Sequence, residues 1–122
     1  NPIACAAAAA NLAIWREEPV RERIASLCDR QEAWRARLAS DSRFHNVRRT
    51  GTIVAAEVAV PDGDYLSAAG PRMAAVFREA NVLLRPLGNA IYLMPPYCID
   101  DDDLAALHAA VDRAADAALA GG

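Results

Sequence analysis

Apolar residues recur at helical spacing between positions 20 and 38 of the chain. Val20, Ile24, Leu27, Trp34 and Leu38 follow one another at intervals of three, four and seven residues, while arginines and acidic residues occupy the other faces. This spacing places the apolar side chains on one side of a helix. We therefore expect an amphipathic helix of about five turns here.

An alanine-rich run from 2 to 15 precedes this segment, with Leu12 and Trp15 one turn apart. Alanine is the strongest helix former, and a face of small residues suits close packing. The run therefore predicts a buried helix. Because Asn1-Pro2 opens it with no preceding cap or tail, we expect the domain to have been cut from something longer.

The pattern changes to β-branched residues between 47 and 60, bounded by the turn residues 61–63. Such a run is typical of one or two strands. Helical spacing resumes from 71 to 80 through Met73 and Phe77, with Gly70-Pro71 as its start or a bend. The last helix is expected after 100–103, on an apolar stripe of Leu104, Leu107, Val111 and Ala114.

Two short strand-like runs, 83–85 and 90–94, flank the residues Pro86-Leu87-Gly88-Asn89. Glycine in such a turn is free to adopt positive φ, so the pair suggests a hairpin. The order is then helix, helix, strands, helix, hairpin, helix. It predicts one α+β domain over 1–122, with helices packed on one face of a mainly antiparallel sheet.

The composition of the chain argues against a membrane span and against cysteine-based sites. The chain has 122 residues, 54% of them hydrophobic, but no uninterrupted apolar run of about 20 residues and no basic leader, so we expect a soluble protein. Its three cysteines lie far apart, which argues against a disulfide framework or a zinc site and favours a reducing cytosol.

All 13 basic residues are arginine, against 16 acidic ones. Because nucleic-acid binding usually needs clustered positive charge, this balance argues against a nucleic-acid partner. The chain also has no lysine, and a Schiff-base enzyme needs a lysine amine to hold its cofactor. This chain cannot supply that amine.

Arg85 stands at the end of a strand-like run beside a proline turn. A guanidinium held there could make a bidentate contact with a carboxylate, although most arginines are simply solvated. Tyr92 and Tyr97 flank the sequence Met94-Pro95-Pro96, and Tyr92 could face the same pocket as Arg85. The alternative is a packed aromatic ring with its hydroxyl at the surface.

Other polar groups suit structural roles. The acidic run 100–103 resembles the start of a calcium loop, but Ala106 occupies the position that requires glycine, so helix capping is the better interpretation. His45 and His108 have no second histidine or cysteine at ligand spacing and are expected to be structural. The sequence contains no GxSxG, P-loop or GxGxxG motif, and no metal site is expected.

Three stretches carry a family resemblance. Residues 83–97, LLRPLGNAIYLMPPY, closely resemble the C-terminal signature of the diaminopelargonate synthase branch of the class III pyridoxal-phosphate (PLP) aminotransferases. Residues 1–8 resemble the Asn-Pro helix start of class III enzymes, and residues 49–57 resemble a later strand. The resemblance implies the C-terminal small domain of a fold-type I PLP-dependent transferase, with the large PLP-binding domain absent from this chain.

The family's reaction is transfer of an amino group from S-adenosylmethionine to 8-amino-7-oxononanoate in biotin biosynthesis, with PLP as cofactor, in a cytoplasmic homodimer. By resemblance, Arg85 pairs with the substrate carboxylate and Tyr92 lines the same pocket. Leu87 stands where some relatives have phenylalanine, which alters the shape of that pocket. The PLP lysine is missing, so the segment alone is expected to be inactive.

Two alternatives remain open at this point. One is another class III aminotransferase that uses an ω-amino donor. The other is an interaction module that kept the small domain and lost catalysis. If the large domain is absent, the first helix and the hairpin should also leave an exposed apolar patch.

Overall fold

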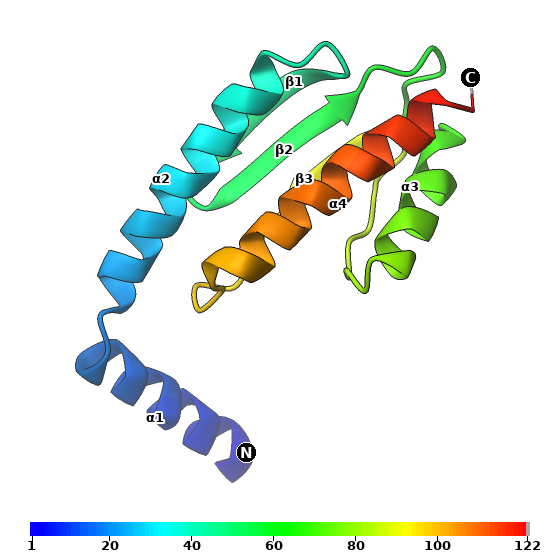
Figure 1. Ribbon diagram of the computed structural model, residues 1–122. Coiled ribbons are helices and arrows are strands. Elements are labelled where there is room, and N and C mark those ends of the chain that lie inside the picture. Colours follow the sequence, from blue (N-terminus) through cyan, green and yellow to red (C-terminus); the bar gives the residue numbers. More distant parts are fainter. Residues whose placement is uncertain (122) are drawn as a thin grey trace.

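The computed structural model describes residues 1–121 (Figure 1). Within them the chain forms four helices and three strands. In chain order these are α1 (Pro2–Glu17), α2 (Val20–Ala39), β1 (Phe44–Thr50), β2 (Ile53–Val58), α3 (Ala69–Glu79), β3 (Ala90–Leu93) and α4 (Asp101–Leu119). The predicted helices are therefore confirmed, and the β-branched run forms two strands rather than one.

The three strands form an antiparallel sheet in the order β1-β2-β3. Val54 of β2 pairs with Arg49 of β1 on one side and Leu93 of β3 on the other. Gly51 makes the tight β1–β2 turn at φ +58°, a conformation that glycine adopts without a steric penalty. A register shift between His45 and Arg48 interrupts the β1–β2 pairing.

The predicted hairpin over 83–94 is wrong. Only its second half forms a strand, and β3 pairs with β2 instead of with residues 83–85. The chain leaves α3 in a compact turn in which the Val82 amide donates to the Phe77 carbonyl at 2.8 Å, and Pro86 has no amide hydrogen to offer a ladder. A single bridge between Leu87 and Ala90 remains of the expected pairing.

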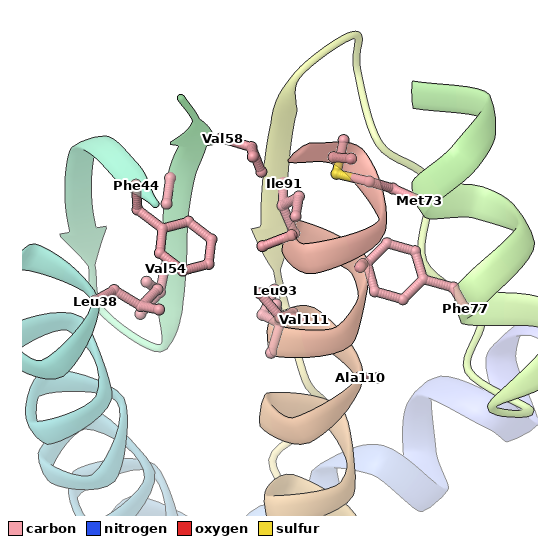
Figure 2. Packing of buried hydrophobic residues seen from close by; sticks show 14 of the residues in the cluster. Leu38, Phe44, Val54, Val58, Met73, Phe77, Ile91, Leu93, Ala110 and Val111 are labelled. Atoms are coloured by element: carbon pink, nitrogen blue, oxygen red, sulfur yellow. The ribbon is translucent and has the colours of Figure 1, made fainter. Parts of the chain in front are cut away.

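The core lies between the sheet and its helices. Helices α2 and α4 cover the same face of the sheet, and α3 packs against α4 (Figure 1). Figure 2 shows Met73 and Phe77 of α3 directed toward α4, where Val111 lies close to Leu93 of β3. Burial of these side chains is the main favourable contribution to folding. The α+β arrangement predicted from the sequence is thus confirmed.

Helix α1 does not follow the prediction of a buried helix, because none of its residues is buried. It projects away from the rest of the molecule (Figure 1). Its alanines and the Asn1 cap, which accepts a hydrogen bond from the Ile3 amide at 3.0 Å, favour the helix locally. The expectation of exposed apolar surface is confirmed here by four side chains, Ile3, Leu12, Ile14 and Trp15.

Candidate functional site

A pocket of about 430 Å³ opens beside Arg85. The start of α3 forms one wall through Pro71 and Ala74, and the segment 84–88 forms the opposite one. The loop before α3, residues 61–68, borders the pocket through Tyr65 and Leu66 and is called the rim loop below. Apart from the guanidinium, most of these groups are apolar. The pocket therefore combines one cation with apolar walls, which suits a ligand with a carboxylate and an aliphatic chain.

The Arg85 guanidinium makes no hydrogen bond or ion pair with any other group in residues 1–121. Some arginines of the chain are engaged: Arg43, for example, donates to Asp41 at 2.7 Å and to Asp112 at 3.0 Å, whereas Arg85 lines the pocket without such a partner. An arginine remains charged at any physiological pH. Arg85 therefore presents a permanent and unused cation to the pocket, consistent with the predicted role in carboxylate binding.

Gly88 holds the two sides of the pocket together. Its φ is +60°, and a Cβ built there would overlap the carbonyl oxygen of Asp64 and lie 2.7 Å from the Tyr65 Cα. The loop before α3 therefore rests directly on the glycine backbone. Gly70 approaches from the other side, since its Cβ would lie 3.0 Å from the Gly88 carbonyl oxygen. A larger residue at position 88 would displace the rim.

Asn89 anchors the same turn. Its amide donates to the Asp64 carbonyl at 3.3 Å, and its buried side chain donates from Nδ2 to the Val58 carbonyl at 3.0 Å. The turn is thereby tied to the rim loop and to the end of β2. The sequence Pro86-Leu87-Gly88-Asn89, predicted as a hairpin turn, serves instead to position Arg85 and Leu87 against that loop.

Two aspartates stiffen the rim loop. Asp62 accepts from the Ser67 hydroxyl at 3.2 Å and from the Ala68 amide at 3.1 Å, and the bond to that amide is the main reason that its pKa lies below the ordinary value. Asp64 accepts from the Leu66 amide at 2.7 Å. Such aspartate turns fix a loop without regular secondary structure.

Tyr92 and Tyr97 lie elsewhere. Tyr92 pairs with Ala55 across the sheet and alternates with the buried Ile91 and Leu93, so it points to the face opposite the helices. Tyr97 lines a separate groove of about 410 Å³ beside Ile53. The structure thus brings Arg85 and Leu87 into one pocket that Tyr92 does not line. A role for Tyr92 in substrate binding stays a prediction.

His108 is partly buried in a cluster with a structural role, as expected from the sequence. Its ring stacks on Trp34, and its Nε2 lies 3.2 Å from the Gln31 oxygen. Burial lowers the pKa of His108 to about 4. The positive charges of Arg37 and Arg30 lower this pKa further, and the negative charge of Asp112 opposes them. The ring is therefore neutral at physiological pH and joins α2 to α4.

The remaining candidates are surface features. His45 lies 3.3 Å from Glu57, which also accepts from Asn46 at 2.9 Å and therefore has a lowered pKa. Asp100 caps α4 by accepting from the Asp103 amide at 2.8 Å, so the capping interpretation is confirmed. The three cysteines are free. No cluster of three metal-ligating side chains occurs in the described part of the chain.

None of the described helices combines the length and apolar character that a bilayer span requires. Sequence reasoning missed the rim residues Tyr65 and Leu66. The available signal was the run Pro61-Asp62-Gly63-Asp64, which marks a turn and so a loop able to present side chains. The pattern did not reveal which pocket they would border.

Comparisons with known proteins agree on one family. The family model described as aminotransferase class-III matches residues 1–115. A curated adenosylmethionine-8-amino-7-oxononanoate aminotransferase from Synechococcus elongatus is 34% identical over 111 residues, which are 91% of this chain and 26% of that protein. The protein of the same name from Helicobacter pylori is 35% identical over 112 residues, 85% of this chain and 24% of its own length. The chain thus spans about a quarter of these relatives.

Solved transaminases share the fold. A structure described as a co-factor free transaminase superposes with a TM-score of 0.81 at 23% identity, over 96% of this chain and 29% of its own. An omega-transferase from Vibrio fluvialis JS17 gives a TM-score of 0.79 at 22% identity, over 96% of this chain and 29% of that one. The α+β fold described above is therefore also a portion of known transaminase chains.

Proposed function

The chain belongs to the class III aminotransferases, and from this premise we propose that the whole protein transfers an amino group from S-adenosylmethionine to 8-amino-7-oxononanoate in biotin biosynthesis. Both substrates appear in the names of the curated relatives. The observation that carries the proposal is the unpaired Arg85 guanidinium at an apolar pocket. That combination matches an acid with a carboxylate at one end of an aliphatic chain.

We assign residues 1–122 to the C-terminal small domain of the enzyme. The family's PLP cofactor supplies the group-transfer chemistry when bound, but it needs a lysine amine and this chain has no lysine. The residues present therefore do not fit attachment of PLP. The role proposed for this chain is therefore substrate recognition only, and we expect the 122 residues alone to be inactive.

Arg85 binds the carboxylate in this scheme, and the apolar walls of the pocket contact the rest of the ligand. A hydrogen bond to a charged group contributes about 1.5 to 3 kcal/mol. Leu87 lines the same pocket and is half exposed, so it would contact the chain of the substrate. We further propose a cytoplasmic homodimer, with Tyr92 contributing to the site only in the assembled enzyme.

The test uses the full-length protein that contains this chain, supplied with PLP. Amino transfer from S-adenosylmethionine to 8-amino-7-oxononanoate is measured for the wild type, Arg85→Ala and Arg85→Lys. We expect Arg85→Ala to raise the KM for the oxo-acid at least tenfold, and Arg85→Lys to recover part of it because lysine keeps the charge but loses the planar fork. An unchanged KM in Arg85→Ala contradicts the assignment.

A second candidate is an aminotransferase with an ω-amino donor. It is favoured by solved structures that superpose well and are described as omega transaminases, among them one from Paracoccus denitrificans with a TM-score of 0.79 at 26% identity. Replacing S-adenosylmethionine by ω-amino acids in the same assay separates the two functions. Failure with every amino donor would instead support the non-catalytic interaction module.

A further inference from the structure

The rim loop of the Arg85 pocket presents two large apolar side chains to solvent. Tyr65 is 70% exposed and Leu66 86% exposed, yet both border the pocket. Exposed apolar groups are common singly, but two neighbours beside an unpaired cation and an apolar hollow are informative. They extend the apolar wall outward from the guanidinium.

Hydrogen bonds and a close backbone contact anchor the loop that carries these side chains. Asp62 and Asp64 fix its backbone by the hydrogen bonds given above. Gly88 supports it from below, in contact with the carbonyl oxygen of Asp64 and with the Tyr65 Cα. A ligand would therefore meet a loop whose backbone is already ordered, which lowers the free-energy cost of binding.

We propose that Tyr65 is a specificity-determining residue, whose ring packs on the aliphatic chain of a carboxylate ligand held by Arg85. The inference rests on the proposed function for the identity of the substrate. Tyr65 lies outside the Arg-Pro-Leu-Gly segment, and its contact would select among carboxylate ligands by the length of their aliphatic chains. An acid too short to reach from the guanidinium to the Tyr65 ring loses the contact, whereas a long one covers it.

The expected size of the effect follows from apolar burial. Each methylene transferred from water contributes about 0.8 kcal/mol, which corresponds to roughly a fourfold change in affinity. A tyrosine ring covers several methylenes, and removing it should cost at least about fivefold in affinity for a long acid. The hydroxyl is not required for this contact.

The experiment measures binding of nonanoate, heptanoate and pentanoate to the full-length protein by isothermal titration calorimetry. We expect wild-type affinity to rise with chain length. Tyr65→Ala should weaken nonanoate at least fivefold and flatten the dependence on chain length, and Tyr65→Phe should stay within twofold of the wild type. Leu83→Ala is the matched control, because Leu83 is fully exposed and does not line the pocket.

Two results overturn the inference: Tyr65→Ala that binds nonanoate as Leu83→Ala does, or wild-type affinity that is independent of chain length or undetectable. Binding is measured without amino transfer, so failure here is distinct from failure of the proposed function. A protein that binds the acids as expected but never transfers an amino group keeps the Tyr65 assignment and loses the enzymatic one.

Discussion

The imidazole of His108 lies parallel to the indole of Trp34, with 4.2 Å between ring centroids and 5° between ring planes. Gln31 completes the cluster, because its buried amide nitrogen donates to the Thr52 carbonyl at 2.9 Å and its oxygen faces His108. The His108 Nε2 must then carry a hydrogen. One buried glutamine thus connects α4 through α2 to the β1–β2 turn.

This cluster should make stability depend on pH. The pKa of His108 is about 4 in the folded protein, against about 6.5 when unfolded. Between these values the unfolded chain binds the extra proton, so the contribution of His108 is complete above pH 6.5 and is lost as the pH falls toward 4. The loss amounts to roughly 1 to 2 kcal/mol, because partial exposure of the ring reduces the full linkage value.

Urea unfolding at pH 7.5 and pH 5 checks this expectation. The matched variant is His108→Phe, which keeps a ring on Trp34 but cannot titrate. It should be less stable at pH 7.5, since the Gln31 oxygen loses its donor. It should also lose less stability than the wild type on going to pH 5. Equal losses in the two proteins would contradict the assignment.

The Gly88 backbone offers a second test, with Gly51 as an internal control. Both glycines have positive φ, +60° and +58°, so alanine at either position costs about 1 to 2 kcal/mol of conformational strain. At Gly51 an added Cβ meets nothing within 4 Å, whereas at Gly88 it overlaps Asp64. Only Gly88→Ala should displace the rim loop.

We therefore expect Gly51→Ala to lower the free energy of unfolding and leave binding of nonanoate unchanged. Gly88→Ala should lower both, with a larger loss of unfolding free energy and a nonanoate affinity reduced severalfold. Urea unfolding and calorimetry on the same preparations measure the two effects. If the two variants behaved alike, the rim would not depend on the close approach at Gly88.

The helices were predictable from the sequence because periodicity reports which residues share a face. Leu27 and Trp34 are buried as the spacing required. The cluster of Trp34 with His108 was not predictable, since its members lie more than seventy residues apart and meet only through packing of α2 on α4. The apolar stripe indicated only that His108 would be structural.

The two errors have separate physical causes. Residues 83–85 have the composition of a strand, but a strand forms only where a second strand pairs with it. Here β3 pairs with the edge of β2 instead of with residues 83–85. The alanine run was correctly predicted as a helix, because helix propensity depends on the local sequence. Burial depends on which other parts of the structure pack against the helix, and the local sequence does not report that. Within the described residues α1 has no buried side chain. The Arg85 role rested on family resemblance rather than on spacing.

Helix α1 provides the last prediction, in which stability and association separate. Leu12 and Trp15 are exposed and contribute no packing to the core, so replacing both with glutamate removes apolar surface without creating a cavity. Glutamate has a good helix propensity, although its charge near the helix C-terminus costs a few tenths of a kcal/mol. The free energy of unfolding of the 122-residue chain should therefore change by less than about 0.5 kcal/mol.

The control for this prediction is Leu27→Ala, at a fully buried position of α2, which should cost about 2 to 5 kcal/mol of unfolding free energy. Sedimentation velocity should show that the double variant self-associates less than the wild type, because exposed apolar patches promote association. A large loss of unfolding free energy in the double variant would mean that α1 packs on the core in solution.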